Sequence, residues 1–474
     1  MSPRRAKLVC TLGPASGTPE GVRALAEAGC DVFRVNLSHG AAESHAGFVQ
    51  AVRTAAEQIG RELAVMADLP GPKIRLGELA TQPLRIRAGS RFVLRAGGGR
   101  LGDETGVRTN YPGLARDVRV GDRVLLADGA VELVVRGVEG EDVVTECVRA
   151  GSVCSHAGLN VPAERLNLPA VTDRDRAALA IAVDLGVDLL AQSFVRSGED
   201  LMELRVLMRD RPIPIIAKIE TRPAIDDIDN LLAQADGIMV ARGDLGVELP
   251  MEEIPILQKE LLRQARAAGK PAIVATQMLE SMTHAPRPTR AEASDVANAV
   301  LDGADAIMLS AESAIGEFPI EAARAAVRIA EVAEERAGGF RVISAPCSHR
   351  DEAAAVAHAV AEVVAGDTEV VAIACFTRTG RTAALLSSER PGVPIYAFAP
   401  DAAVRRRLAL RWGVTGLAAR IPGSTDEMID LMDSGLRAAG VAAVGDTVVM
   451  SGSLPAGKTQ TNMLKVHHVG EAAG

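Results

Sequence analysis

The chain has 474 residues, of which 48% are apolar and 24% charged, the ordinary mixture of a folded globular protein. At about 150 residues per domain, this length predicts about three domains. Aromatic residues make up only 2% and the net charge is −9, which argues against stacking platforms for single-stranded nucleic acid and against general binding to nucleic acid or to an anionic membrane.

The cysteines and the apolar residues predict a cytoplasmic protein. The six cysteines form no CxxC pair, so we interpret them as thiols of a reducing compartment and not as a disulfide framework. The N-terminal segment carries charge but only a short apolar run before Thr11, unlike a secretory signal. Charged residues interrupt every apolar stretch of about 18 residues, the length that begins to span a membrane. We therefore expect a soluble protein that binds no membrane.

Short β-branched runs alternate with amphipathic, helix-like segments along most of the chain. The segment Thr18–Ala28 is typical, with Pro19 near its start and Gly29 just past its end. Eight strands that alternate with helices predict a parallel sheet, and the number eight favours a (β/α)8 TIM barrel. The predicted strands are Lys7–Leu12, Asp31–Leu37, Leu63–Leu69, Val187–Phe194, Ile213–Ile219, Gly237–Val240, Ala272–Thr276 and Ala304–Leu309, and further helices are predicted at Glu199–Arg209, Glu252–Ala268 and Thr289–Leu301.

Two intervals depart from this alternation. Residues 76–168 contain many glycines and strand-like runs, which predicts a small β domain inserted after the third strand, where it could act as a lid. From residue 340 the alternation resumes at lower density and predicts a separate, doubly wound α/β domain. The predicted organisation is barrel (1–75), inserted β lid domain (76–168), barrel (169–339) and C-terminal α/β domain (340–474). In the last domain we predict strands at Val370–Cys375, Pro394–Phe398 and Thr447–Met450 and helices at Asp351–Ala365, Arg381–Glu389 and Ala402–Arg411.

Polar residues gather where the predicted barrel strands end. Active sites of such barrels lie at the carboxyl ends of the strands, so these residues are expected to share one rim. Scattered structural polar groups are the alternative reading of the same rim. The strand ends carry Arg34, Asn36, Ser38 and His39; Asp68; Ser193 and Arg196; Lys218 and Glu220; Arg242, Gly243 and Asp244; Thr276 and Gln277; and Ser310 and Glu312.

Glu220 and Asp244 end adjacent predicted strands and make a candidate metal site. Two carboxylates held close repel unless a cation lies between them, and an oxygen pair with open positions suits Mg²⁺. Two solvated carboxylates with separate arginine partners are the alternative. Lys218 lies two residues before Glu220 and so on the same strand face. Its ammonium could stabilise charge on a transferred group, or it could simply pair with Glu220.

Two further features suit an anionic substrate. Arg34 shares a strand face with Asn36 and Ser38, and a guanidinium offers a fork of donors to a phosphate. Gly243 lets backbone N–H groups approach an anion closely. Arginine, lysine, Mg²⁺ and backbone donors that converge on phosphate are the apparatus of phosphoryl transfer. The residues alone therefore indicate a metal-dependent phosphoryl or enolate enzyme of open identity.

Six long segments carry a closer resemblance. They are residues 10–16 (CTLGPAS), 34–40 (RVNLSHG), 217–220 (AKIE), 239–246 (MVARGDLG), 275–281 (ATQMLES) and 287–298 (RPTRAEASDVAN). With these segments the chain resembles the pyruvate kinase family over essentially its whole length. The resemblance implies a barrel, a lid and a C-terminal effector domain. It also implies transfer of a phosphoryl group from phosphoenolpyruvate to ADP, giving pyruvate and ATP.

The resemblance also implies roles for individual residues. Glu220 and Asp244 are similar to the family's ligands of the catalytic Mg²⁺, which Mn²⁺ could replace. Lys218 is similar to the lysine that stabilises the transferring phosphoryl group and the enolate. The resemblance further implies that Arg34 contacts the phosphate and that Gly243, Asp244 and Thr276 contact the substrate. Thr276 would lie near the site where the enolate is protonated. The implied nucleotide contacts are Arg75, His39 and Asn36. A homotetramer is a further expectation from the family.

Two departures from the family pattern stand out. Lys73 replaces a glutamate and Leu69 a threonine, a pattern associated with activity that does not require K⁺. A fixed ammonium can supply the charge that a bound K⁺ would bring, so we expect the former K⁺ site of Asn36, Ser38 and Asp68 to work without it. In the lid, Ala157 stands where the family commonly has a lysine that reaches the nucleotide phosphate. Weaker affinity for ADP is expected, although the neighbouring His156 could substitute.

A loop of the C-terminal domain resembles the family's sugar-phosphate effector loop. It follows a predicted strand, opens a predicted helix and combines hydroxyls, arginines and helix-start N–H groups, which favour phosphate. An ordinary helix cap with exposed arginines is the alternative. The loop consists of Thr377, Arg378, Thr379, Gly380, Arg381 and Thr382, with residues 453–459 as a candidate second wall.

Two other functions fit part of the pattern. Another Mg²⁺ barrel enzyme that acts on phosphoenolpyruvate or pyruvate would share the acids and the metal but would not need the lid or the effector domain. An inactive relative that only senses a metabolite would not need to keep Lys218, Glu220, Asp244 and Thr276 together.

Overall fold

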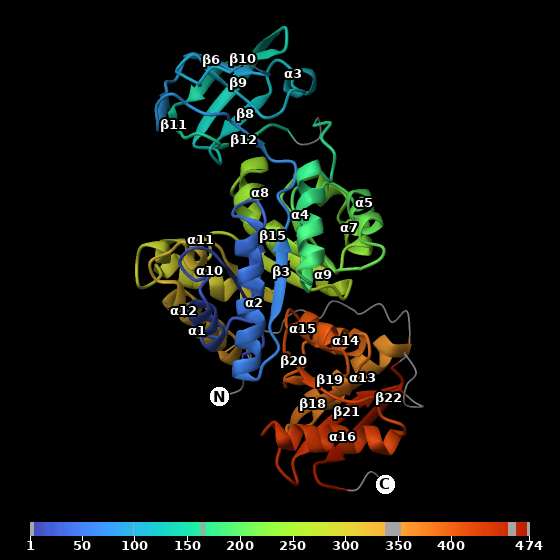
Figure 1. Ribbon diagram of the computed structural model, residues 1–474. Coiled ribbons are helices and arrows are strands. Elements are labelled where there is room, and N and C mark those ends of the chain that lie inside the picture. Colours follow the sequence, from blue (N-terminus) through green and yellow to red (C-terminus); the bar gives the residue numbers. More distant parts are fainter. Residues whose placement is uncertain (1–3, 98, 163–165, 337–351, 454–460, 472–474) are drawn as a thin grey trace.

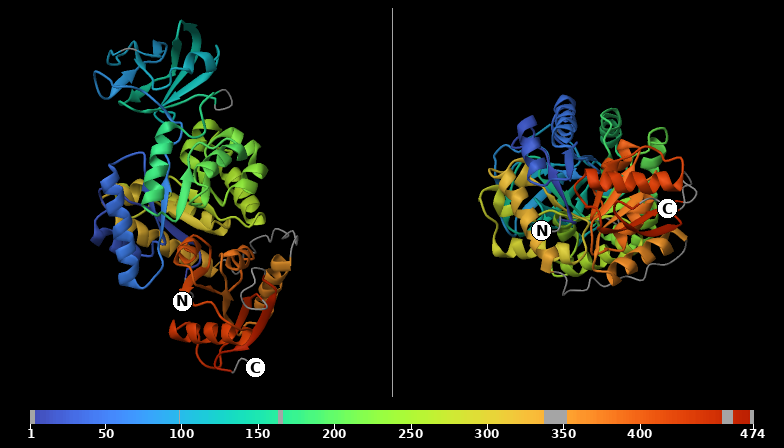
Figure 2. Two further views of the ribbon diagram at one scale, coloured as in Figure 1. Left: turned by 45° about the vertical axis from the view of Figure 1, so that its right-hand side comes forward. Right: turned by 90° about the horizontal axis from the view of Figure 1, so that it is seen from below.

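The computed structural model describes residues 4–97, 99–162, 166–336, 352–453 and 461–471. Figure 1 shows three folded parts arranged along one direction, with a barrel in the middle, a β domain beyond one end of it and an α/β domain at the other. Figure 2 shows the same arrangement from a second side. The C-terminal domain therefore lies at the end of the barrel that is opposite to the inserted domain.

Eight parallel strands close into a barrel in the order β1-β17-β16-β15-β14-β13-β3-β2, which confirms the predicted fold. Their residues are almost all buried, as expected for strands enclosed by side chains within the barrel and covered by helices outside it. Seven of these strands fall inside their predicted runs, and β15 extends one residue beyond its run, to Ala241. The strands are β1 (Lys7–Thr11), β2 (Val32–Asn36), β3 (Ala64–Asp68), β13 (Leu189–Gln192), β14 (Ile215–Ile219), β15 (Gly237–Ala241), β16 (Ala272–Ala275) and β17 (Ala306–Leu309).

The barrel helices begin where polar residues can satisfy the first free N–H groups. Thr18 accepts a hydrogen bond from Gly21 N, and Thr289 forms a reciprocal capping box with Glu292. Gly29 ends the first helix with a φ of 109°, which favours glycine. The helices are α1 (Pro19–Glu27), α2 (Ala42–Ile59), α4 (Asp173–Asp184), α5 (Gly198–Leu207), α6 (Arg222–Asp226), α7 (Ile228–Gln234), α8 (Arg242–Glu248), α9 (Ile254–Ala267), the 3-10 turn η2 (Glu280–Thr283), α10 (Arg290–Leu301), α11 (Ala311–Ala314) and α12 (Pro319–Arg336).

The inserted domain leaves the barrel between two strands that pair with each other, β3 and β13. It contains a seven-stranded sheet, a two-stranded sheet and one short helix around its own apolar core. Because the insertion follows the carboxyl end of β3, it stands over the rim where the polar residues gather. Its elements are β4 (Ile74–Arg75), β5 (Leu84–Ile86), β6 (Arg91–Arg95), β7 (Gly106–Arg108), α3 (Leu114–Asp117), β8 (Arg123–Leu126), β9 (Val131–Glu139), β10 (Asp142–Arg149), β11 (Gly151–Val153) and β12 (Gly158–Asn160).

The C-terminal domain is a five-stranded sheet in the order β20-β19-β18-β21-β22, in which only β22 is antiparallel. Separate apolar clusters lie on its two faces, as the doubly wound prediction requires. Sequence analysis missed β20, α16 and β22. The elements are α13 (Glu352–Gly366), β18 (Val370–Phe376), α14 (Arg381–Ser388), β19 (Ile395–Ala399), α15 (Ala402–Leu408), β20 (Val414–Ala418), α16 (Thr425–Ala438), β21 (Thr447–Gly452) and β22 (Met463–His468).

Ion pairs fasten this domain to the amino-terminal ends of the barrel strands. Arg405 Nε lies 2.6 Å from Glu62 Oε1, and Arg406 Nε lies 2.7 Å from Asp188 Oδ1. Asp188 is buried just before β13, and its Oδ2 also accepts hydrogen bonds from Val65 N and Arg53 Nη1, both at 2.8 Å. One carboxylate thus holds two barrel segments and the C-terminal domain together.

Over the described residues, no helix is both long enough and apolar enough to cross a membrane. The described cysteines are free thiols, four of them buried and one exposed. Cys347 lies outside the described residues.

We predict that Asp188→Ala lowers the stability of the barrel and loosens the C-terminal domain. The change leaves Arg53 and Arg406 without their carboxylate, and both guanidiniums are roughly three-quarters buried. The expected loss is about 3 kcal/mol, the low end for breaking a buried ion pair because both arginines keep some contact with water. Urea unfolding followed by circular dichroism measures it. Asp184→Ala, at an exposed position of α4, is the matched control, and equal midpoints for the two variants would contradict the prediction.

Candidate active site

A buried ammonium group lies at the centre of the candidate site. Lys218, on β14, has its Nζ 2.8 Å from Ser193 Oγ, 2.9 Å from Glu220 Oε1 and 3.5 Å from Asp68 Oδ1. The side chains of Lys218, Asp68 and Glu220 are all nearly inaccessible to solvent. The structure therefore brings together residues from the ends of three neighbouring strands, β3, β13 and β14.

The protonation states of this cluster depend on one another. Burial alone would lower the pKa of Lys218, but Asp68 and Glu220 hold the pKa of this ammonium above its ordinary value. Burial would raise the pKa of Asp68, but Lys218 and Arg34 hold that pKa below its usual range. Burial raises the pKa of Glu220, and the nearby charge of Asp244 adds to the rise while Lys218 opposes it. Lys218 therefore stays protonated, whereas burial and the charge of Asp244 make the ionised form of Glu220 less favourable.

Arg34 extends the cluster toward β1 and β2. Its Nε lies 2.6 Å from Asp68 Oδ2, and its Nη1 donates to Thr11 Oγ1 at 3.1 Å. The guanidinium is largely buried, and Asp68 fixes its direction. Arg34 and Lys218 thus present two cations around one carboxylate at the same rim.

The other side of the site is formed by the first turn of α8 and the end of β16. Gly243 N donates to Thr276 Oγ1 at 2.8 Å, which joins the first turn of α8 to the end of β16. Thr276 has a φ of 69°, a strained conformation for a β-branched residue. Arg242 holds it there, because Arg242 Nη2 donates to Thr276 O at 2.9 Å while its guanidinium pairs with Asp295 at 2.7 Å.

Lys73 reaches into the site from the segment just before β4, where the chain enters the inserted domain. Its Nζ lies 2.9 Å from Asp244 Oδ1 and 3.9 Å from Asp128 Oδ1 of the β domain. It also lies 5.6 Å from the centre of the Phe194 ring, a distance at which a cation is attracted to the face of an aromatic ring. Lys73 therefore neutralises one of the two predicted metal ligands.

The donor set fits a divalent cation that also binds substrate. Among the described residues, no three His, Cys, Asp or Glu side chains are grouped to hold a metal, so Glu220 and Asp244 would supply only two ligands. Mg²⁺ commonly binds to one or two carboxylates and completes its shell with water and substrate phosphate. Each carboxylate now faces an ammonium group, Lys218 or Lys73, at 2.9 Å. Both carboxylates therefore lie where positive charge is required.

Comparison with known proteins decides the family. A family model described as "Pyruvate kinase, barrel domain" matches residues 3–323, and one described as "Pyruvate kinase, alpha/beta domain" matches residues 354–467. The chain belongs to the pyruvate kinase family. A protein named pyruvate kinase from Mycobacterium intracellulare is 43% identical over 99% of both chains. Those from Corynebacterium glutamicum and Geobacillus stearothermophilus are 41% and 40% identical over 99% of this chain and 98% and 81% of their own. The protein is thus a phosphotransferase of this family.

The residues that the family resemblance assigns to nucleotide lie beside the cluster. Arg75, on β4, donates from Nη1 to His156 O at 3.1 Å. Burial and the nearby charges of Arg75, Arg174 and Arg34 lower the pKa of His39, so these groups share one electrostatic environment. Asn36 Oδ1 accepts a hydrogen bond from Ser38 N at 3.0 Å. Lys73 lies two residues before Arg75, and its ammonium contacts Asp244, Asp128 and Phe194.

The predicted effector loop adopts a tight turn before α14. Gly380 N donates to Thr377 Oγ1 at 3.0 Å, and Arg381 N donates to Thr379 Oγ1 at 3.4 Å. Gly380 caps α14 with a φ of 88°. Thr382 lies 2.6 Å from Thr461 across the domain, measured between the two Oγ1 atoms. Of the candidate second wall, residues 454–459 lie outside the described residues.

Sequence reasoning missed how several polar residues are used. Ser193 was recognised at a strand end but given no role, although its Oγ contacts Lys218 and Leu69 O. Glu312, at another strand end, does not face the site: it is fully buried and accepts hydrogen bonds from Leu279 N and Ser310 N. Its position after β17 indicated the rim, but no local pattern distinguished a supporting role from a binding one.

We predict that Asp68→Asn is less stable than the unaltered protein at neutral pH and that the difference shrinks in acid. Ionised Asp68 has a lowered pKa in the folded chain, so its stabilisation is complete above the ordinary carboxyl pKa of about 3.9 and is lost as the pH falls through the folded value. Thermal unfolding of both proteins from pH 7 down to the acid limit measures the difference. Asp184→Asn is the exposed control. A difference that is the same at every pH would refute the assignment of charge to Asp68.

Proposed function

We propose that this protein transfers the phosphoryl group of phosphoenolpyruvate to ADP, giving pyruvate and ATP, with Mg²⁺ bound by Glu220 and Asp244. The observation that carries the proposal is the buried Lys218 ammonium, which lies 2.9 Å from Glu220 while Glu220 feels the charge of Asp244. A cation fixed beside a two-carboxylate site suits a reaction in which negative charge moves between oxygens. Mn²⁺ could take the place of Mg²⁺ in the same oxygen set.

In this proposal, each residue acts through charge and position. Lys218 and Arg34 bind the phosphate of phosphoenolpyruvate and stabilise the charge of the group in transfer, and Asp68 keeps both cations oriented. When bound, the divalent cation supplies Lewis-acid stabilisation of phosphate and enolate oxygens. Thr276 holds its hydroxyl beside Gly243 N, where the substrate would lie and the enolate would be protonated. The β domain excludes water from this rim.

We assign the nucleotide to Arg75, His39 and Asn36. Ala157, at the position of the family's lid lysine, packs against the apolar core of the β domain and offers no cation. The carbonyl of His156 accepts a hydrogen bond from Arg75, so the lid still takes part in holding this arginine. Weaker binding of ADP than in relatives with the lysine is the expected consequence.

We further propose that activity does not require K⁺. Lys73 brings a permanent positive charge into the site, 2.9 Å from Asp244, so the Asn36, Ser38 and Asp68 group need not bind a monovalent cation. Asp68 already has Arg34 and Lys218 as partners, which supports the same conclusion.

Regulation and assembly complete the proposal. The loop Thr377–Thr382 binds a phosphorylated effector through its hydroxyls and the start of α14, and the chain acts as a cytoplasmic homotetramer. These assignments rest on the family and on the hydroxyl-rich turn.

The first test is ATP formation from phosphoenolpyruvate and ADP with Mg²⁺ in a K⁺-free buffer, with the unaltered protein and Lys218→Met. We expect turnover by the former and a loss of about 10²–10³-fold in kcat for the latter, the usual cost of removing one preorganised charge. Lys259→Met, on the exposed face of α9, is the matched control. No turnover by the unaltered protein, with sugar phosphates or AMP also present, would favour a metabolite sensor instead.

The second test concerns Lys73. Lys73→Glu places a carboxylate beside Asp244 in place of an ammonium, so we expect its activity to depend on added K⁺. Rates at constant ionic strength, with K⁺ or with tetramethylammonium, measure this dependence, and Lys259→Glu is the matched charge reversal. If Lys73→Glu works equally well in both salts, the charge-replacement argument fails while the kinase assignment stands.

A further inference from the structure

The turn that joins β2 to α2 carries residues that we assign to the nucleotide, and side chains from two helices hold it. Arg174, an exposed residue in the first turn of α4, donates a hydrogen bond from Nη2 to Ser38 O at 2.6 Å. His45, in α2, has its Nε2 2.8 Å from His39 O. Because Ser38 O belongs to the peptide bond with His39, the Arg174 guanidinium is held next to the backbone of His39.

A second guanidinium comes from the inserted domain. Arg75 lies on β4, which pairs with β12, and its Nη1 donates a hydrogen bond to His156 O at 3.1 Å. Ala157, the residue after His156, packs against the apolar core of this domain and brings no charge. Arg75 is thus held by the inserted domain, whereas Arg174 is held by the barrel.

The side-chain charges that act on His39 are all positive. Partial burial lowers the pKa of His39, and the charges of three arginines lower this pKa further: Arg75, Arg174 and Arg34. Arg34 is paired with Asp68. In the described part of the chain, neither Arg75 nor Arg174 pairs with a carboxylate, and the hydrogen bonds of their guanidiniums go to backbone carbonyls. A region with two unbalanced cations attracts a polyanion.

We propose that Arg174 and Arg75 together bind the phosphates of ADP, so that Arg174 supplies from the barrel a charge that Ala157 does not supply from the inserted domain. The inference rests on the proposed function, which makes ADP a substrate. A guanidinium has five N–H donors, and the hydrogen bond to Ser38 O occupies one of them, so Arg174 can keep this bond and still donate to phosphate oxygens. Two guanidiniums suit a diphosphate because each can form paired, charge-assisted hydrogen bonds with its oxygens.

Replacement of Arg174 by methionine, which keeps an unbranched side chain but removes the charge, tests the inference. In the presence of Mg²⁺, Arg174→Met should raise both the Kd of ADP, measured by calorimetric titration, and the KM for ADP about tenfold or more, as expected for the loss of charged hydrogen bonds. The kcat and the KM for phosphoenolpyruvate should stay within about twofold, because the lost interaction is the same in the ground state and the transition state. Arg176→Met, in the same helix, is the matched control: Arg176 pairs with Glu203 at 2.6 Å, and its loss should not affect ADP.

A lysine in the inserted domain separates phosphate binding from a structural role of Arg174. If Arg174 only holds the turn through Ser38 O, a cation from the other domain cannot replace it. If Arg174 binds phosphate, Ala157→Lys added to Arg174→Met should recover part of the affinity for ADP, because position 157 directly follows the carbonyl that Arg75 contacts. Ala157→Met in the same background adds a side chain without charge and should recover none.

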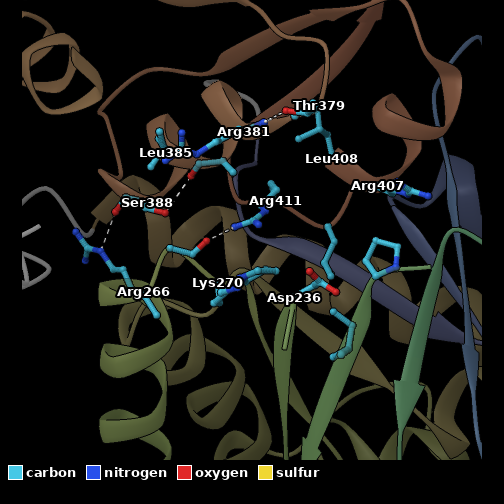
Figure 3. Close-up of a pocket in the computed structure, with 18 of the residues that line it drawn as sticks. Asp236, Arg266, Lys270, Thr379, Arg381, Leu385, Ser388, Arg407, Leu408 and Arg411 are labelled. Carbon is cyan, nitrogen blue, oxygen red and sulfur yellow. Dashed lines mark hydrogen bonds between the residues drawn. The ribbon is translucent and has the colours of Figure 1, made fainter. Parts of the chain in front are cut away.

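A second cationic region has to be distinguished from this one in the titrations. The interdomain cavity, between the barrel and the C-terminal domain, has a volume of about 630 Å³ and lies at the end of the barrel opposite to the candidate active site. Figure 3 shows side chains from both domains around this space. Its charged lining residues are Arg266, Lys270, Arg381, Arg407 and Arg411, with one carboxylate, Asp236. Arg407→Ala should leave the Kd and the KM for ADP unchanged.

Four results would overturn the inference. The first two are that Arg174→Met binds ADP as tightly as the unaltered protein, or that Arg407→Ala weakens binding and Arg174→Met does not. The third is an equal rise of KM for ADP and for phosphoenolpyruvate, which would assign Arg174 to the stability of the whole rim. The fourth is that Ala157→Lys recovers nothing, which would assign Arg174 to the turn alone. Failure of the proposed function is distinguishable, because the unaltered protein would then form no ATP while the titrations would still measure its affinity for ADP.

Discussion

The buried ammonium of Lys218 is the charge on which the arrangement of the candidate site depends. It draws Asp68 and Glu220 to the same point from different strands, and each carboxylate then fixes something else. Asp68 orients Arg34, and Glu220 accepts a hydrogen bond from Phe194 N at 2.7 Å. Removing one member of such a buried set leaves the opposite charges unpaired, which typically costs more than the pair contributes. The cluster is therefore a rigid unit, and the polar atoms of its side chains that are not used within it are oriented for a ligand.

Three of the seven non-glycine residues with positive φ in the described chain lie at the same rim. Phe194, Thr276 and Gln277 all have positive φ values near 60°, a conformation that costs about 1–3 kcal/mol for a residue other than glycine. The surrounding contacts hold these turns in place: the Glu220 carboxylate engages Phe194 N, and Arg242, itself paired with Asp295, engages Thr276 O. The strain thus coincides with turns of the candidate site, where a relaxed backbone would point these groups elsewhere.

Much of this architecture could be predicted from the sequence, because buried parallel strands leave a clear pattern. The eight apolar runs predicted the barrel, and the polar residues after them predicted the rim where the buried cluster lies. The contact of Lys73 with Asp244 could not be predicted, since the two lie 171 residues apart on either side of the inserted domain. From the sequence alone, the Glu312 carboxylate could equally be a metal or substrate ligand. The structure shows that it accepts hydrogen bonds from two backbone N–H groups instead. In β20 only Val414 is buried, so its apolar pattern was too weak to detect.

The strands that carry the site also connect it to the C-terminal domain. Strand β15 begins beside Asp236 at the interdomain cavity and leads directly into Arg242 and Asp244, and β14 runs from Ile215 to Lys218 in the same direction. Five residues of strand span about 17 Å. Packed protein interiors have low compressibility and transmit strain. The contacts with the C-terminal domain and the two carboxylates thus lie at opposite ends of the same two strands, and the inserted domain is not part of either strand.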